Sequence, residues 1–536
     1  MKTADVETAY ESGAWQKKSL RHLLTRTSSF VTCVELVTSR GIITERHGRR
    51  VLELARELVG HPRIDALSIT DNPGGNAMIS ADTLGTDLIS RGQEVIIHLS
   101  CKDWNRNALQ SRGWKLASEG FRNVLMLTGD YPADGYAGQA GGVFDIDSVG
   151  LLKMYSDMNE GLPADPHGDK FGRRMERTDF FLGAVVTNYK RYEREVMPQY
   201  FKLAKKIETG AAFIINQVGY DSRKQDELLK YMRLKELHVP VLANVYVLSI
   251  GATRYFHTGK IPGVVVTDEL LALAEKYAKG PDKGKAFFLD FAARQCAVAR
   301  GLGFRGVYLG GHLNGEDYER VLLTADRYGD NDWRELAQQI QFHQPDEFYF
   351  FEPNPATGLS STEINREYLK SKGAEVRKGL RRGVPWSYKL NRVVHDSLFE
   401  PGTRGFDLAR KFSQRAVASR RLGKSLHAAE KALKILAFDC RDCGDCSLPD
   451  IAFLCPESQC AKNQRNGPCG GTRQGHCEVG EKQCIWALAY DRLKAYGEEE
   501  EMLDRPVVFR DGALKGTSAW LNTFLTRDHH GKKSRE

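Results

Sequence analysis

The C-terminal part of the chain carries a dense group of cysteine thiols. Eight of the eleven cysteines lie between residues 440 and 484, and the other three are scattered. Buried structural cysteines spread through a core, so this density indicates either cross-links or metal ligation. Eight thiolates are enough for two sites of four ligands each. The candidate ligands are Cys440, Cys443, Cys446, Cys455, Cys460, Cys469, Cys477 and Cys484.

The spacing of the first four thiols bears on the kind of metal. Cys440-x-x-Cys443-x-x-Cys446 followed by Cys455-Pro456 is similar to ferredoxin-type cluster binding, although the gap before Cys455 is longer than usual. Zinc sites favour paired Cys-x-x-Cys knuckles, whereas the last four cysteines are singly spaced. The first expectation is therefore iron–sulfur clusters, of the 4Fe-4S kind, and the alternative is zinc.

A second set of candidate residues follows short apolar runs earlier in the chain. Glu35 is the most informative, because residues 31–37 are otherwise mostly apolar. A carboxyl in such a run is partly desolvated, so its pKa rises and it can hold a proton near neutral pH. The alternative is a buried acid paired with a cation such as Arg40. The set comprises Glu35, Thr70, Asp71, His98, Ser100, Thr128, Gly129, Asp130, Gln217, Asn244 and His312.

The elements that must position these residues repeat in a regular order. Apolar, β-branched runs alternate with amphipathic segments of helical spacing, which predicts a (β/α)8 barrel with its chemistry at the C-terminal strand ends. A doubly wound open sheet is the alternative, but no strand–GxGxxG–helix unit is present. The expected strands are 30–36, 66–70, 95–99, 124–127, 180–186, 212–216, 239–246 and 306–309. Expected helices include 50–59, 107–119, 191–208, 224–237 and 285–300.

Length and composition predict a multidomain globular protein. A chain of 536 residues is too long for one ordinary core. We expect a barrel over residues 25–330, a linker or interface segment over 331–385, and a mainly helical, cysteine-rich metal-binding domain over 386–525. The Gly-rich stretch 135–142 is expected as a loop over one barrel mouth, and the charged tail after residue 527 as disordered.

Location and partners follow from the same composition. No apolar run reaches 18 residues and the N-terminus lacks the apolar core of a signal peptide, so we expect a cytoplasmic protein without a membrane span. Disulfides are rare in that compartment, which favours metal over cross-links. The net charge of +8 is interpreted as a solvated basic face rather than a nucleic-acid surface. A homo-oligomer is left open.

Taken together, the strand-end residues resemble a known family. They occur in the order and approximate spacing of the flavin-dependent methylenetetrahydrofolate reductases, over about residues 25–325. The C-terminal part is similar to the cysteine-rich domain that accompanies this reductase in some bacteria, fused or as a separate subunit. The motifs are Cys33-Val34-Glu35-Leu36, His98-Leu99-Ser100-Cys101, Leu127-Thr128-Gly129-Asp130-Tyr131-Pro132, Gly210-Ala211…Asn216-Gln217 and, for the second domain, Phe351-Glu352-Pro353-Asn354-Pro355 with the cysteines.

The resemblance implies hydride transfer through FMN, rather than FAD, between 5,10-methylenetetrahydrofolate and 5-methyltetrahydrofolate. NAD(P)H is the implied electron donor, and a redox protein is the alternative partner. Glu35 matches the general acid that protonates N10, Asp130 an acid beside flavin and pterin, and Gln217 a pterin-contacting amide. The implied flavin contacts are Thr70, His98, Thr128, Gly129, Asp130 and Phe144, with Lys205 and Lys206 near the phosphate.

Some positions depart from the family pattern. Thr128 stands where many relatives have an arginine, Val186 stands where the family has a tyrosine, and residues 158–177 resemble an insertion. These changes leave the electron donor and the working direction open. Two other functions also stay open: a pterin-binding barrel methyltransferase with a corrinoid partner, and a non-catalytic metal-binding scaffold that docks a redox partner.

Overall fold

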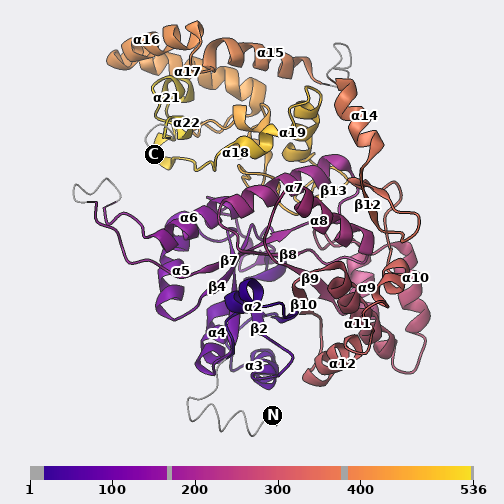
Figure 1. Cartoon of the computed structure of the whole chain (residues 1–536). Helices are drawn as coiled ribbons and strands as arrows, with labels where there is room; N and C mark the ends of the chain where they lie inside the picture. The colour runs from indigo at the N-terminus through magenta and orange to yellow at the C-terminus, as the bar shows by residue number, and fades with distance from the viewer. Residues whose placement is uncertain (1–16, 166–171, 376–383, 533–536) are drawn as a thin grey trace.

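The computed structural model describes residues 17–165, 172–375 and 384–532 of the chain (Figure 1). Eight parallel strands form a closed barrel in the order β1-β10-β9-β8-β7-β4-β3-β2. Each predicted strand is present, so the expected (β/α)8 barrel is confirmed. The strands are β1 (Val31–Leu36), β2 (Ala66–Ile69), β3 (Glu94–Ser100), β4 (Asn123–Leu127), β7 (Phe181–Val186), β8 (Phe213–Asn216), β9 (Val241–Tyr246) and β10 (Gly306–Gly310).

Helices surround the barrel and cover its strands. Several begin at a polar residue whose side chain accepts a hydrogen bond from the first turn, as Asn105 does from Ala108 and Asp147 does from Val149. Such helix-start signals are local, and the helix expected over 107–119 differs from α5 by one residue at each end, whereas α6 was not among the helices named from the sequence. The helices are α3 (Arg46–Leu58), α4 (Ala81–Ser90), α5 (Arg106–Ser118), α6 (Ser148–Glu160), α7 (Glu193–Glu208), α8 (Ser222–Leu234), α9 (Ile250–His257), α10 (Asp268–Tyr277), α11 (Lys285–Leu302) and α12 (Gly315–Ala325).

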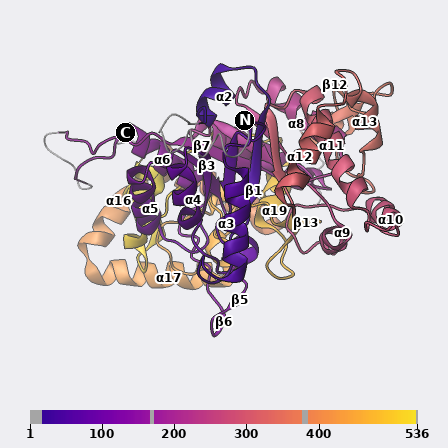
Figure 2. The same cartoon turned by 90° about the horizontal axis from the view of Figure 1, so that it is seen from below.

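A short helix that the sequence did not predict, α2 (Leu20–Arg26), closes one end of the barrel. Its three buried leucines pack in one cluster with inward-facing strand residues such as Phe181 and Phe213. In Figure 1 this helix lies across the middle of the barrel, and in Figure 2 it lies at the opposite end from the hairpin β5 (Asp134–Gly135) and β6 (Gly138–Gln139). Because α2 fills the N-terminal mouth, the C-terminal mouth is the end left for chemistry.

The segment expected as a linker or interface packs on the barrel surface. After α13 (Trp333–Gln339) it forms the antiparallel pair β11 (Phe351–Pro353) and β12 (Ser360–Ile364), followed by α14 (Arg366–Glu375). Ser360 N donates to Asp226 Oδ2 of α8 over 2.9 Å. Buried Glu227 of α8 accepts a hydrogen bond from Phe350 N over 2.5 Å. These contacts fix the segment against α8.

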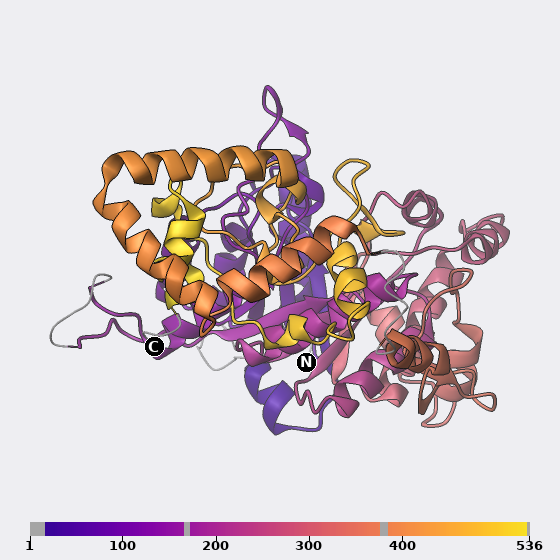
Figure 3. The same cartoon turned by 90° about the horizontal axis from the view of Figure 1, so that it is seen from above.

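The C-terminal region is mainly helical, as expected, and lies against the barrel on the side of α7. Its long outer helices are drawn in orange in Figure 3, and the cysteine segments lie between them and the barrel. The expected helical stretch 404–437 is two helices that meet at Ser419. In the described part of the chain, no helix is long and apolar enough to cross a membrane. The helices are α15 (Trp386–Val394), α16 (Arg404–Ala418), α17 (Arg420–Phe438), α18 (Pro456–Gln459), α19 (Ile485–Lys494), α20 (Glu501–Asp504), α21 (Ala519–Phe524) and α22 (His529–Lys532).

The tail contradicts one expectation. Residues after 527 were expected to be disordered, but α22 is formed there and His529 is buried. The last residues of that expectation, 533–536, lie outside the described part of the chain. The reason is a pair of carboxylates, Asp445 and Asp450, which accept hydrogen bonds from the His529 ring. The polar residues at the start of this tail therefore form buried ion pairs instead of remaining in solvent.

Candidate functional site

A network of polar side chains lies inside the barrel around Glu35. The Tyr308 hydroxyl donates to Glu35 Oε1 over 3.3 Å and also lies 3.2 Å from Ser68 Oγ and 3.2 Å from His98 Nε2. Ser68 Oγ and His98 Nε2 are 2.9 Å apart. The four residues come from β1, β2, β3 and β10, which are neighbours in the barrel. The structure thus brings together Glu35 and His98, and it adds two partners that the sequence did not identify.

Burial raises the pKa of Glu35 above its ordinary value, while the hydrogen bond from Tyr308 opposes that rise. Arg40, the cation considered as its partner, is exposed and donates to Asn76 instead. Space for the carboxyl depends on a glycine, because a Cβ atom at Gly310 would lie 2.8 Å from Glu35 Oε2. Glu35 is therefore a half-buried, partly desolvated acid held by a phenol rather than a member of an ion pair.

His98 is neutral in this environment. It is buried, and burial lowers the pKa of its imidazole to about 3. A neutral ring can donate from one nitrogen and accept at the other, so His98 offers hydrogen bonds without bringing a positive charge to the site.

The loops after β2 and β4 meet beside this network. Asp130 Oδ2 accepts a hydrogen bond from Gly74 N over 2.8 Å. A Cβ atom at Gly75 would lie 2.1 Å from the Tyr131 carbonyl oxygen, so the two backbones approach closely only because a glycine stands there. Asp71 is turned elsewhere and accepts from Ser100 N over 3.0 Å. The structure therefore places Asp130 at the mouth and uses Asp71 to fasten two strand ends.

Other predicted contacts lie around the same mouth. The Gln217 amide is held by Val218 N, over 2.9 Å, and by the Pro262 carbonyl, over 3.2 Å. Phe144 is buried and its ring stacks on Tyr131 with centroids 6.2 Å apart. Thr70 is buried and its N–H donates to the Leu36 carbonyl. Asn244 on β9 is half-buried, and His312 is exposed. The contacts of Thr128 and Gly129 are described below.

The two lysines predicted near a phosphate contact protein carbonyls. Lys206 Nζ donates to the Val185 carbonyl over 2.6 Å, and Lys205 Nζ to the Pro506 carbonyl over 3.5 Å. Burial lowers the pKa of Lys206 to about 7 and that of Lys205 to about 8. Both side chains lie on the last turn of α7, and none of their hydrogen bonds reaches the Glu35 network.

All eleven cysteines are free thiols, and the eight C-terminal ones form two groups. Burial raises the pKa of the Cys440 thiol, and the nearby Cys446 and Cys455 raise it further. Burial likewise raises the pKa of Cys443, with Cys446 adding to the effect. In the second group, burial raises the pKa of both Cys460 and Cys484 to about 12. After burial, the nearby Cys469 makes the largest contribution to the rise of the pKa of each. Cys477 also lies near Cys469. These influences associate the first four thiols in one neighbourhood and the last four in another, although among the described residues no three of the sulfur atoms lie within 4.8 Å of one another.

The second thiol group borders the barrel mouth. Lys462, two residues after Cys460, donates to the Gly129 carbonyl over 2.7 Å, and Thr128 Oγ1 donates to Gln464 Oε1 over 3.2 Å. Gln199 of α7 donates to the Cys469 carbonyl over 2.7 Å. Burial would lower the pKa of Lys462, but Cys469, Glu478 and Asp130 hold it above its ordinary value. These contacts place a candidate metal ligand set beside the predicted flavin loop.

A cavity of about 710 Å³ opens between the barrel and this thiol segment. Its wall includes the loop that carries Gly263, whose Cβ position is 3.2 Å from Gln217 Nε2. On the opposite side it is lined by Cys477 and Glu478. Sequence reasoning could not find this cavity, because it forms between segments that lie more than 200 residues apart.

Comparisons with known proteins agree with this arrangement. Residues 45–309 match the family model described as methylenetetrahydrofolate reductase, and residues 420–511 match the one described as methylene-tetrahydrofolate reductase C terminal. A search of curated proteins returned no match.

Solved structures give weaker likenesses. An uncharacterized protein from Clostridium thermocellum that binds two copies of 5-methyl-5,6,7,8-tetrahydrofolic acid is 14% identical with a TM-score of 0.39, over 57% of this chain and 96% of that one. A 2,3-dimethylmalate lyase of the PEP mutase/isocitrate lyase superfamily is 12% identical with a TM-score of 0.30, over 56% and 79%. At these TM-scores neither structure adds to the assignment. On its two family matches, the chain belongs to the methylenetetrahydrofolate reductase family and carries the C-terminal domain of that reductase.

Proposed function

We propose that this protein interconverts 5,10-methylenetetrahydrofolate and 5-methyltetrahydrofolate on a barrel that binds FMN. The observation that carries the proposal is the desolvated Glu35, held by Tyr308 inside a barrel of the reductase family. Glu35 precedes the first matched residue of the family model, so its proposed role rests on the resemblance of its strand motif and on its desolvated position in the barrel. Bound FMN would supply the hydride chemistry, which no side chain can perform.

Glu35 is the proposed general acid. Its raised pKa keeps the carboxyl protonated closer to neutral pH than that of an ordinary glutamate. In the reducing direction it would deliver that proton to N10 of the folate, which opens the five-membered ring of the substrate. In the reverse direction the carboxylate would take the proton back. Tyr308 fixes the orientation of the carboxyl and limits the rise of its pKa.

The residues at the mouth fit a flavin in their chemistry. His98 offers a neutral hydrogen-bonding edge, and glycines at 75 and 129 allow the close loop approach and the left-handed backbone found at the mouth. The proposed flavin contacts remain Thr70, His98, Thr128, Gly129, Asp130 and Phe144, and Gln217 and Asp130 would hold the pterin. Lys205 and Lys206 would have to exchange their carbonyl contacts for a phosphate.

The eight C-terminal cysteines are proposed to bind two metal centres. Their division into Cys440, Cys443, Cys446 and Cys455, and Cys460, Cys469, Cys477 and Cys484, supplies four thiolates to each. Four thiolates suit a 4Fe-4S cluster or a zinc ion. If the metal is iron, the thiol group that borders the mouth would be placed to exchange electrons with the flavin site. The outside electron donor would then be a redox protein or NAD(P)H. With zinc, the domain would be a structural clamp.

Replacing Glu35 tests the proposal. Glu35→Gln keeps the size and a hydrogen-bonding group but removes the transferable proton. We expect folate turnover to fall by about 10²- to 10⁴-fold, while reduction of bound FMN stays within twofold of wild type. Glu45→Gln, at an exposed position, is the matched control and should leave both half-reactions unchanged. Folate turnover at the wild-type rate in Glu35→Gln would show that another group donates the proton.

A further inference from the structure

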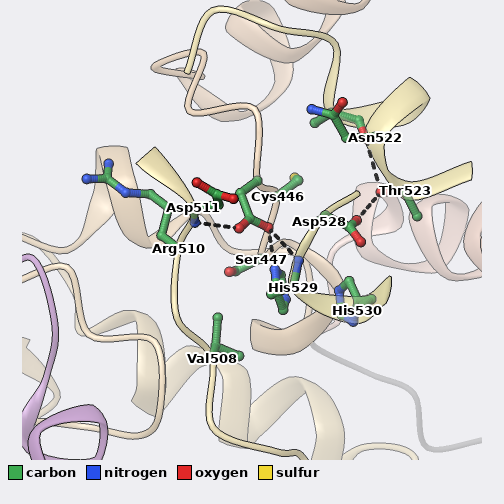
Figure 4. A network of polar contacts seen from close by, with 12 residues as sticks. Cys446, Ser447, Val508, Arg510, Asp511, Asn522, Thr523, Asp528, His529 and His530 are labelled. Atoms are coloured by element: carbon green, nitrogen blue, oxygen red, sulfur yellow. Dashed lines mark hydrogen bonds and ion pairs between the residues drawn. The ribbon is translucent and has the colours of Figure 1, made fainter. Parts of the chain in front are cut away.

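Two adjacent histidines of the C-terminal tail pack against the loop between Cys446 and Cys455. His529 Nε2 lies 2.9 Å from Asp450 Oδ2, and His530 Nε2 lies 3.7 Å from Asp450 Oδ1. One ligand atom from each of these three residues lies within 4.8 Å of the other two. Figure 4 shows the two histidines next to each other, and their ring centroids are 4.0 Å apart. None of these residues has a part in the proposed folate chemistry.

A second carboxylate fixes the ring of His529. Asp445 Oδ1 accepts from His529 Nδ1 over 2.5 Å and from its backbone N–H over 3.2 Å. The other oxygen of Asp445 accepts from Asp511 N over 2.8 Å. A carboxylate on one imidazole nitrogen orients the ring, which is the usual arrangement around a metal-bound histidine. The other nitrogen, Nε2, faces Asp450 Oδ2 over 2.9 Å, so a metal bound between them would replace that hydrogen bond.

The charges around the group suit a divalent cation. Asp445 and Asp450 bring two buried negative charges to the site. The Arg505 guanidinium lies 4.0 Å from Asp450 Oδ1, and its partner Glu501, at 3.5 Å, offsets part of its charge.

The three side chains lie close enough together to reach one small ion. Zinc bound to nitrogen and oxygen at about 2.0–2.1 Å places its ligand atoms about 3.3 Å apart. His529 Nε2 lies 2.9 Å from one oxygen of Asp450 and His530 Nε2 lies 3.7 Å from the other oxygen, so small movements of these side chains would bring one atom of each to that spacing. Two histidines and one carboxylate also form a known zinc ligand set, with water as the fourth ligand.

We propose that Asp450, His529 and His530 bind one zinc ion, with Asp445 positioning His529. This site is separate from the eight thiols and uses only nitrogen and oxygen. It fastens the tail to the segment 445–450, which leads from Cys446 toward Cys455. The metal therefore stabilises the loop that presents the first thiol group.

X-ray absorption at the zinc edge tests the proposal on the full-length protein. Anaerobically purified holoprotein is treated with a mild chelator, given one equivalent of Zn²⁺ and measured. We expect one zinc with only nitrogen and oxygen neighbours at about 2.0–2.1 Å. His530→Gln and Asp450→Asn should bind zinc at least tenfold more weakly, and Asp445→Asn should weaken binding by about 10- to 100-fold. His22→Gln, at an exposed position, should bind zinc as the wild type does.

Two results would overturn the proposal. One is zinc with sulfur neighbours at about 2.3 Å, which would place the ion on the thiols. The other is unchanged zinc affinity in His530→Gln. The wild-type spectrum identifies the ligand type without any variant, so the test does not depend on how the variants fold. Iron, acid-labile sulfide and flavin are counted in each sample, and the outcome does not depend on folate turnover.

Discussion

The acidity of Glu35 depends on two neighbours that act in opposite directions. Burial in an apolar strand raises its pKa, and the hydrogen bond from Tyr308 lowers it. Proton donation requires the protonated carboxyl, so the folate half-reaction should slow as the pH rises through this raised pKa. Rate measurements of that half-reaction over a pH series should therefore show a decline on the alkaline side.

Tyr308→Phe should shift this decline. The variant keeps the ring and removes only the hydroxyl that stabilises the ionised carboxylate, so the pKa of Glu35 should rise further. We expect the alkaline decline to move to higher pH by about one unit, as the loss of one hydrogen bond to a charged group predicts. Flavin reduction, measured in parallel, should show no such movement. A shift to lower pH would mean that Tyr308 stabilises the protonated form.

Some site residues were predictable from the sequence and others were not. Glu35 breaks an apolar run, which is a local signal, and the family resemblance supplied its role. Tyr308 and Ser68 are ordinary strand residues in apolar runs, and only the pairing of β10 with β1 and β2 with β1 brings them to Glu35. Strand register is a non-local property, so no local pattern could identify these partners.

Among the elements, β10 shapes the site through Gly310, the residue at its end that has no side chain. Gly310 leaves the space that the Glu35 carboxyl occupies, because an added Cβ atom would lie 2.8 Å from Oε2. In Gly310→Ala the carboxyl must move, and displacing a reacting group by about 1 Å can cost up to 10²-fold in rate. We expect a 10- to 100-fold loss of folate turnover with wild-type flavin content.

The matched control for this element is Gly135→Ala in the exposed hairpin, where an added Cβ atom meets nothing within 4 Å. Steady-state kinetics of folate turnover and flavin absorbance are measured on Gly310→Ala and Gly135→Ala. Equal turnover in the two would mean that the Glu35 carboxyl adapts without loss of function.

The elements of the barrel were easier to predict than the segment that follows it. Strands and helices between residues 30 and 302 show clear alternation of apolar and amphipathic runs. The short strands β11 and β12 carry no such signal, and proline suggested a linker. Their stability comes from buried polar contacts with α8, more than 100 residues earlier.

At the scale of the whole molecule, the two domains share a polar interface built on α7. Lys202 is buried, and its Nζ donates to Gln464 Oε1 and to the Gly467 and Pro468 carbonyls over 3.0–3.2 Å. All three acceptors belong to the segment between Cys460 and Cys469. This lysine thus connects a barrel helix to the loop of the second thiol group, a link that neither domain's sequence reveals alone.

Lys202→Met keeps the length of the side chain and removes the three hydrogen bonds. Buried acceptors left without a donor cost about 1–3 kcal/mol each when no water replaces it. We expect the melting temperature to fall by several degrees and protease cleavage between Cys460 and Cys469 to quicken. Lys153→Met, where a half-buried lysine pairs with Asp157 within its own helix, is the control and should do neither. If both variants behaved alike, the interface would be held by its apolar contacts, and the position of the thiols beside the mouth would not depend on Lys202.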